Sequence, residues 1–221
     1  MKRVSSMTAT ALFAAAVAVT PAWAVQSQRY EPEASSSRIT LEGTSSMHNW
    51  EEKGTVIRGS LVLTETDTAC LWSGTALPHQ TISPAASVEI PVESLTSGKS
   101  GMDKNMYRTL KADKHPVITY RLESAEIQPS QPAPRDLPGA EITVNTTGIV
   151  TVAGQEKRMQ IPMRIKRLPE NRLEVSGETS LRMSDFGVPP PKFMAGLLRV
   201  GDEVRVRWIW GLAPAADGKT R

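Results

Sequence analysis

Apolar and polar side chains alternate along much of this chain, a pattern typical of β-strands with one buried face. The alternation is clearest between residues 203 and 210, where valine or tryptophan follows each glutamate or arginine. Other segments alternate less regularly but also have strand-like composition. The predicted strands cover residues 37–42, 54–65, 87–93, 116–126, 141–152, 158–166, 172–183 and 203–210.

One segment has helical periodicity instead. Met102, Met106 and Leu110 fall at helical spacing within residues 102–111, and Pro116 returns the chain to a strand. Tight turns are expected at residues 153–156 and 169–171. Many antiparallel strands with short hairpins and a single helix predict a closed barrel or a sandwich.

The polar faces of the strands indicate which side meets water. Charged residues such as Arg164, Glu174 and Arg182 occupy these faces, so we expect them to point outward. A parallel α/β sheet would be apolar on both faces, and a membrane barrel would carry its apolar band outside. We therefore predict an all-β, soluble antiparallel barrel with an apolar interior that does not span a membrane.

The first 24 residues have the pattern of a secretory signal peptide. Lys2 and Arg3 precede a short apolar run at 11–19, and Ala22-Trp23-Ala24 matches the A-x-A cleavage pattern. The run is too short for a membrane span of about 20 residues. We expect cleavage after Ala24 and export to the periplasm.

The mature chain is predicted to hold one domain. Residues 25–36 are expected to lead into a barrel domain at 37–211, and residues 212–221 to form a flexible tail. The net charge of +3 falls to +1 without the two basic residues of the signal peptide (24 basic against 23 acidic). Because no basic cluster with interleaved aromatics is present, nucleic-acid binding is not expected. Cys70 is alone and cannot form an internal disulfide.

Candidate catalytic residues occur together in TSSMHNW at 44–50. Ser45 or Ser46 is a candidate nucleophile and His48 its base, but Met47 stands where a nucleophile elbow needs its second glycine. The histidines are too far apart in sequence to match a metal-ligand motif. We therefore expect no enzyme, no metal and no cofactor, with a hydrolase or isomerase that uses His48 as the alternative.

The apolar interior is the other candidate site. Methionine is flexible and suits a wall that adapts to a variable apolar ligand. The competing interpretation is a core filled by its own side chains, which would make the protein a stress-related interaction module.

The order of several short motifs resembles that of the YceI-like family of periplasmic polyisoprenoid-binding proteins. The resemblance runs from roughly residue 37 to residue 210. The motifs are GTSSMHNW at 43–50, VEIPVESL at 88–95, MDKNM at 102–106, LKADKHPVITY at 110–120, TGIVTVAG at 147–154 and MSDFGVPPP at 183–191.

This resemblance implies an extended, lipocalin-like antiparallel barrel of eight strands with one capping helix. It implies that the barrel holds a long apolar lipid, such as a polyisoprenoid, a quinone precursor or a fatty acyl chain, without catalysis. The helix at 102–111 would be the lid. The candidate lipid-binding residues are His48, Trp50, Leu61, Met102, Met106, Leu110, Val150, Ile161, Met163, Leu181, Met183 and Trp208.

Two departures from better-studied members leave the ligand open. Lys111-Ala112-Asp113-Lys114 stands where those members carry a Phe-Phe pair, and residues 70–83, with Trp72 and His79, resemble an inserted loop. A homodimer is also left open by the sequence.

Overall fold

The computed structural model describes residues 26–72, 80–128, 137–193, 195 and 197–216, so the predicted signal peptide and His79 lie outside the described residues. The strands are β1 (Ser27–Pro32), β2 (Arg38–Ser45), β3 (Trp50–Gly54), β4 (Arg58–Thr64), β5 (Thr81–Ile82), β6 (Ala85–Pro91), β7 (Val117–Ile127), β8 (Glu141–Val152), β9 (Gln155–Arg167), β10 (Leu173–Arg182), β11 (Lys192–Phe193) and β12 (Leu198–Pro214). The helices are α1 (Glu65–Trp72) and α2 (Ser100–Thr109), with short 3₁₀ turns η1 (Ala34–Ser36), η2 (Val92–Ser94), η3 (Pro169–Asn171) and η4 (Met183–Phe186).

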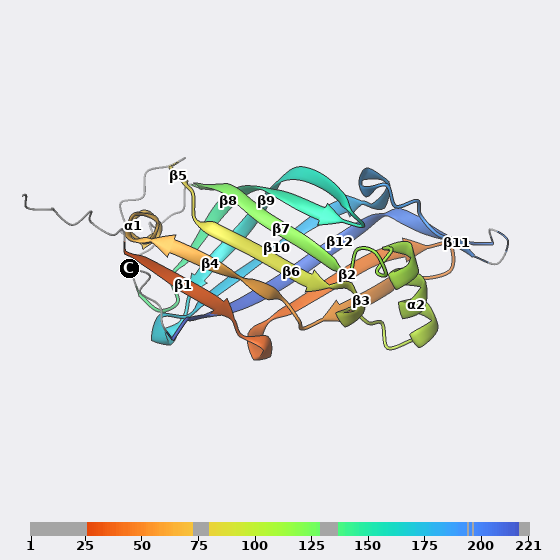
Figure 1. The fold of residues 1–221 in the computed structure, drawn as a ribbon, viewed down its shortest axis with the longest axis horizontal. Coiled ribbons are helices and arrows are strands. Elements are labelled where there is room, and N and C mark those ends of the chain that lie inside the picture. The colour runs from red at the N-terminus through yellow and green to blue at the C-terminus, as the bar shows by residue number, and fades with distance from the viewer. Residues whose placement is uncertain (1–25, 73–79, 129–136, 194, 196, 217–221) are drawn as a thin grey trace, which may run out of the picture.

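Eight strands close into an antiparallel barrel, as predicted. Their order is β1-β4-β6-β7-β8-β9-β10-β12, and β12 pairs back with β1 to complete the ring. β2 pairs with the same edge of β12 as β1 does, and β3 pairs with β2. The barrel is elongated, with α1 at one end and α2 at the other (Figure 1).

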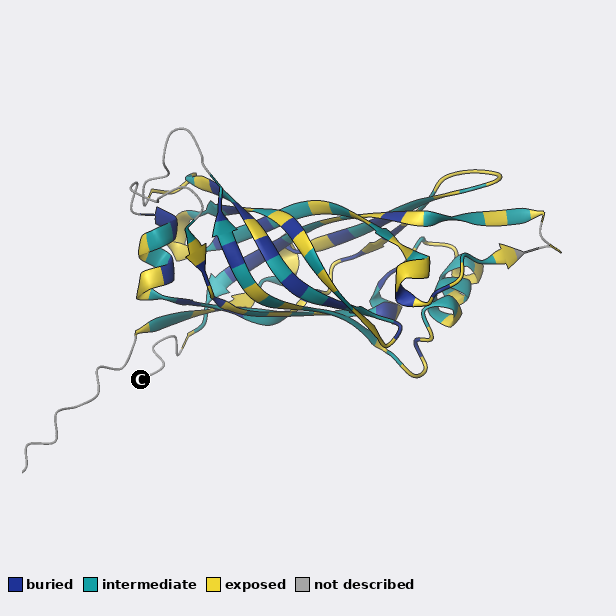
Figure 2. Cartoon of the chain, turned by 90° about the horizontal axis from the view of Figure 1, so that it is seen from above, coloured by how far each residue is buried: buried dark blue, intermediate teal, exposed yellow. Residues whose placement is uncertain are grey.

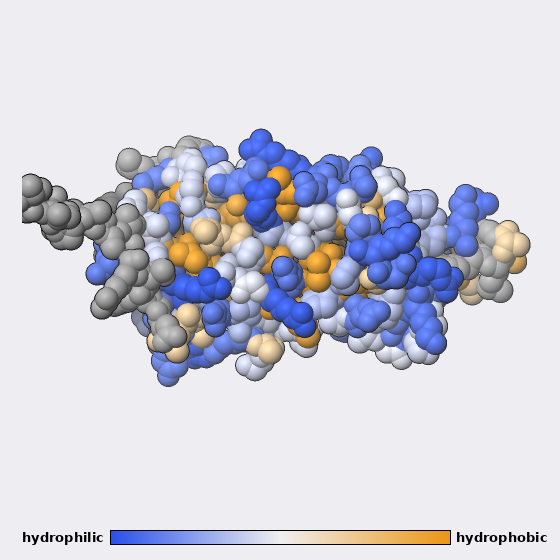
Figure 3. Space-filling view, viewed as in Figure 1, coloured by the Kyte–Doolittle hydropathy of each residue, from blue (hydrophilic) through white to orange (hydrophobic). Residues whose placement is uncertain are grey.

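Side-chain burial follows the alternation predicted from the sequence. Along β8, Ile142, Val144, Thr146 and Val150 are buried, whereas Glu141 and Asn145 are exposed. Figure 2 shows buried and exposed positions alternating along the strands. Hydrophilic side chains cover most of the face seen in Figure 3, with smaller hydrophobic areas between them. The apolar face of each strand is therefore the interior.

The hairpin between β8 and β9 is a tight two-residue turn. Val152 pairs with Gln155, and the two residues between them have positive φ, 50° for Ala153 and 80° for Gly154. Positive φ at both central positions is typical of the type I′ turn, whose twist suits the right-handed twist of paired strands. The predicted hairpin is confirmed.

A second helix, α1, corrects the prediction of a single helix. The Asp67 amide donates to the Thr64 hydroxyl (3.0 Å), and the Thr64 amide donates to the Asp67 carboxylate (2.9 Å). This reciprocal pair is a capping box, which satisfies backbone donors at a helix N-terminus. The predicted strand at 54–65 therefore ends at Thr64, and residues 70–72 of the predicted loop form the end of α1.

The barrel sheet extends from β1, near the start of the described residues, to β12, near their end. β1 lies within residues 25–36, which were expected only to lead into the barrel, and Tyr30 on this strand is buried. β12 continues to Pro214, and Leu212 is fully buried between Pro32 and Leu173 of the neighbouring strands. Neither described helix has the length and apolarity that a membrane crossing requires.

Candidate binding cavity

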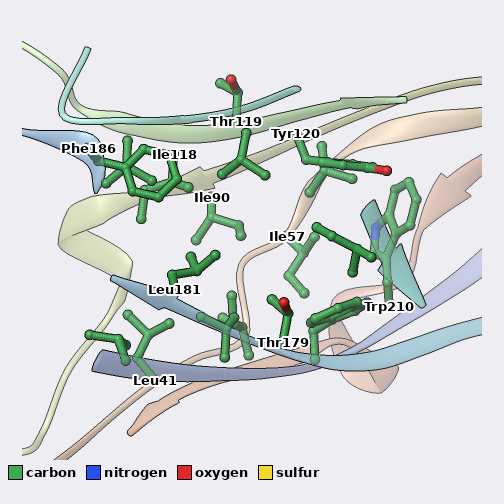
Figure 4. Close-up of a pocket in the computed structure, with 18 of the residues that line it drawn as sticks. Leu41, Ile57, Ile90, Ile118, Thr119, Tyr120, Thr179, Leu181, Phe186 and Trp210 are labelled. Atoms are coloured by element: carbon green, nitrogen blue, oxygen red, sulfur yellow. The ribbon is translucent and has the colours of Figure 1, made fainter. Parts of the chain in front are cut away.

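The barrel encloses a cavity of about 560 Å³. Its wall is made by residues from β2, β3, β4, β6, β7, β8, β9, β10 and β12, together with residues from both α-helices. In Figure 4 the labelled side chains converge from the surrounding elements, and Ile90 and Leu181 project toward the middle of the shared space. Binding pockets for small molecules usually have volumes of roughly 300–1,000 Å³, so the interior is large enough for a ligand.

Every candidate lipid-binding residue named from the sequence lies on the wall of this cavity. α2 contributes Met102 and Met106, and Leu110 follows directly after it. The others come from the strands, from the loop between β2 and β3, and from η4: His48, Trp50, Leu61, Val150, Ile161, Met163, Leu181, Met183 and Trp208. Contact of these residues with a ligand stays a prediction.

The two ends of the cavity differ in exposure. Toward α1 the wall is closed by Leu63, Leu71 and Ile82, all nearly inaccessible to solvent. Toward α2 the wall includes His48 and Arg182, which are exposed. The cavity is therefore more open at the α2 end, the end of the barrel at which α2 lies (Figure 1). The lid role of α2 stays a prediction.

Aromatic rings lie flat on the wall over glycines rather than filling the lumen. A β-carbon at Gly177 would lie 2.4 Å from the ring of Trp208, its partner on the adjacent strand, and one at Gly148 would lie 2.5 Å from the Tyr120 ring. Because glycine has no side chain, each ring can occupy the space beside the backbone. This arrangement keeps bulky aromatic groups in the wall and leaves the centre open.

The hydroxyl groups beside the Tyr120 ring form a satisfied chain. The Tyr120 hydroxyl donates to Thr146 Oγ1 at 2.9 Å, and this hydroxyl in turn donates to the Ile161 carbonyl oxygen at 2.7 Å. Paired hydroxyls avoid the cost of leaving buried polar groups without partners. This part of the wall therefore presents mainly carbon to the lumen.

Two polar atoms of the wall, Glu52 Oε2 and Trp210 Nε1, are buried without a hydrogen-bond partner among the described residues, and Glu52 is the one that can carry a charge. It points inward from β3 and is only 1% exposed. Burial, and secondarily the charge of Asp103, raises the pKa of the Glu52 carboxyl to about 7. This carboxyl therefore exists in both protonation states near neutral pH.

Asp103 and Tyr107 hold α2 to residues 95–97, the segment that precedes it. The Asp103 carboxylate accepts hydrogen bonds from the Ser97 amide (2.8 Å), the Ser97 hydroxyl (2.6 Å) and the Thr96 hydroxyl (2.7 Å), which lower its pKa. The Tyr107 hydroxyl donates to the Leu95 carbonyl oxygen at 2.7 Å. Asp103 thus stays ionised and places a fixed negative charge near Glu52.

The serines near His48 are occupied by backbone contacts. The Ser45 hydroxyl donates to the His48 carbonyl oxygen at 2.7 Å, and the Ser46 hydroxyl donates to the Leu197 carbonyl oxygen at 3.1 Å. Neither bond pairs a serine hydroxyl with the His48 imidazole, as a nucleophile and its base would require. Among the described residues, no group of three or more His, Cys, Asp or Glu is placed to hold a metal ion.

Sequence reasoning did not single out Glu52 or the glycines beneath the aromatic rings. Glu51-Glu52-Lys53 reads as a charged run on a solvent-facing segment, and only the pairing of β3 with β2 shows that its middle residue points inward. The glycine contacts depend on register between strands, which a single sequence does not give. A glycine inside an alternating strand, such as Gly177 in β10, was the one available signal.

A model of the YceI-like domain family matches residues 30–208. This match spans most of the chain. The protein belongs to the YceI-like family.

Solved structures share the fold of this YceI-like protein at low sequence identity. A polyisoprenoid-binding domain from Saccharophagus degradans, described as implicated in plant cell wall breakdown, is 14% identical with a TM-score of 0.60, covering 84% of this chain and 98% of its own. BcnA from Burkholderia cenocepacia is 15% identical with a TM-score of 0.57, covering 81% and 98%. These likenesses establish the fold. No match was found among curated proteins.

Proposed function

We propose that this YceI-like protein binds one long apolar lipid chain inside its barrel and carries or stores it in the periplasm, without catalysing a reaction. The observation that supports this most is the open interior, about 560 Å³ in volume, whose surface is almost entirely apolar. An interior filled by its own side chains, as an interaction module would have, does not fit this observation.

Burial of a hydrocarbon chain supplies ample free energy for such binding. Each buried CH₂ group contributes about 0.8 kcal/mol, so ten groups give on the order of 8 kcal/mol before the ordering of the chain is subtracted. The alternating strands allow the same molecule to present a charged exterior to water. No catalytic group is needed for this function.

The ligand class follows from shape and from the relatives. A deep cavity closed at the α1 end favours a linear chain, such as a polyisoprenoid, a quinone precursor or a fatty acyl chain. The Saccharophagus degradans structure is described as a polyisoprenoid-binding domain, which supports the first of these. The signal-peptide pattern in residues 1–24 supports a periplasmic location.

The alternative of a hydrolase or isomerase that uses His48 is less well supported. The nearby serine hydroxyls bind backbone carbonyl oxygens rather than the imidazole. His48→Ala tests this alternative directly: loss of a measured turnover would support an enzyme, whereas unchanged turnover would rule His48 out as the base.

Extraction of the purified protein with organic solvent tests the proposed function. Mass spectrometry of the extract should detect an isoprenoid or fatty acyl lipid that is absent from an extract of the final wash buffer. A protein that carries no lipid, and that takes up none when the delipidated form is titrated with farnesol, would contradict the proposal.

A further inference from the structure

The unpaired carboxyl of Glu52 is the only acidic side chain on the cavity wall among the described residues. Its neighbour in register, Leu41 on β2, is apolar, and α2 covers this part of the barrel with Met102, Asn105 and Met106 on the wall. A buried polar group without a partner costs on the order of 1–3 kcal/mol or more when charged. Such a group in the wall of an apolar cavity needs a partner that the described protein does not provide.

We propose that Glu52 is the recognition site for the polar end of the bound lipid, and that this end donates a hydrogen bond: an alcohol, an amide or an ammonium group. This inference rests on the proposed function, because it names the headgroup of the same ligand. Glu52 accepts the hydrogen bond, while the apolar wall contacts the rest of the molecule.

The charges around Glu52 exclude an anionic headgroup at this position. Asp103 and Tyr107 of α2 interact electrostatically with Glu52, and the Asp103 carboxylate adds negative charge. The cationic residue of the cavity wall, Arg182, is exposed, and its charge acts on the carboxylate of Asp202. A phosphate or carboxylate beside Glu52 would therefore meet like charge.

The position of Glu52 also sets the orientation of the ligand. β3 lies near α2 at the mouth end of the barrel, whereas Leu63, Leu71 and Ile82 close the other end (Figure 1). A headgroup held by Glu52 therefore lies beneath the lid, and the hydrocarbon tail extends toward α1. The ligand enters tail first.

Three probes with the same C15 isoprenoid tail test this proposal: farnesol, farnesylamine and farnesyl phosphate. Each is titrated into delipidated protein while the fluorescence of the cavity tryptophans (Trp50, Trp208 and Trp210) is followed. The wild type should bind the alcohol and the amine more tightly than the phosphate. Glu52→Leu should lower the affinity for the alcohol and for the amine by about tenfold to a hundredfold. It should not lower the affinity for the phosphate.

Two further variants separate recognition from folding. Glu51→Leu is the matched control, because Glu51 is exposed on the opposite face of the same strand and its loss should change no affinity. Glu52→Gln keeps the shape of the side chain and an oxygen that accepts a hydrogen bond, so its affinity for farnesol should be retained. Its affinity for farnesylamine should fall below that of the wild type above pH 7, where wild-type Glu52 is mostly ionised.

The outcomes distinguish this inference from the proposed function. Farnesol and farnesylamine affinities that stay within about twofold of wild type in Glu52→Leu, or a phosphate affinity that falls equally, would overturn the headgroup site and leave lipid binding intact. Failure of all three probes to bind the wild type would overturn lipid binding itself.

Discussion

The indole ring of Trp50 lies across Gly43, its cross-strand partner, so closely that a β-carbon at Gly43 would lie 2.2 Å from Cζ2 of the ring. The indole Nε1 also donates to the Thr44 carbonyl oxygen at 3.2 Å. These two contacts fix the position of the ring along the wall. Glycine at position 43 has no β-carbon that would occupy the same space as the ring.

Gly43→Ala should displace this ring and destabilise the protein by about 1–3 kcal/mol, the usual cost of overpacking. Chemical denaturation measures the loss, and the tryptophan emission should shift as the ring moves. Gly101→Ala is the matched control, because a β-carbon at Gly101 meets nothing within 4 Å and its site in α2 favours alanine. Equal changes in unfolding free energy for the two substitutions would show that a β-carbon beside the Trp50 ring does not destabilise the protein.

Glu52→Gln should stabilise the ligand-free protein at alkaline pH. The folded-state pKa of about 7 lies above the usual 4.5, so the folded protein binds the proton more tightly than the unfolded chain does. Stability therefore falls as pH rises from 4.5 to 7, and the full penalty applies above 7. Glutamine does not titrate and avoids this loss.

The expected gain above pH 7 is about 2–3 kcal/mol, because a pKa raised from 4.5 to about 7 corresponds to roughly 3 kcal/mol. The difference between the two proteins should disappear below pH 4.5. Urea unfolding at several pH values measures this difference in stability, and Glu51→Gln, at an exposed position of the same strand, is the control. A difference that does not change with pH would contradict the raised pKa.

Tyr107→Phe should loosen the lid. The lost hydrogen bond to the Leu95 carbonyl oxygen contributes about 1 kcal/mol, so ligand release should become about fivefold faster. Stopped-flow displacement of a bound probe measures the release rate. Lys104→Ala, an exposed change on the same helix, should leave the rate unchanged. An unaltered rate in Tyr107→Phe would indicate that ligands do not leave past α2.

Thr64→Ala should destabilise the α1 end by about 1 kcal/mol, the typical contribution of an N-cap residue. The substitution removes the hydroxyl that accepts from the Asp67 amide and leaves the buried Asp67 with one fewer partner. Thermal unfolding measures the effect against Thr66→Ala, which removes an exposed threonine from the same helix. Equal melting temperatures for the two variants would contradict the capping role.

The barrel was predictable because its strands carry their burial pattern in consecutive residues. In β12, Val204 and Trp210 are buried whereas Arg205 and Arg207 are exposed, as the alternation indicates. β1 was not predictable in this way, because in SQRYEP only Tyr30 is buried. Its role depends on pairing with β4 and β12, distant in sequence.

Helix α1 and the inward-pointing Glu52 were not predicted from the sequence, for different reasons. The Thr64-x-x-Asp67 spacing is a readable capping signal that the prediction from the sequence did not use, and it lies at the end of a run with strand-like composition. Glu52 breaks the alternation of its strand, so its inward direction followed only from register with Leu41. Apolar wall residues repeat with period two and can be inferred from sequence; a single polar group placed among them cannot.

The most direct test of the central claim fills the lumen from within. Leu181 projects into the cavity, whereas the adjacent Ser180 is exposed on the outer face of β10. Calorimetric titration of the delipidated proteins with farnesol should give single-site binding in wild type and in Ser180→Trp, and binding at least about tenfold weaker in Leu181→Trp. Equal affinity in all three folded proteins would contradict a lipid site inside the barrel.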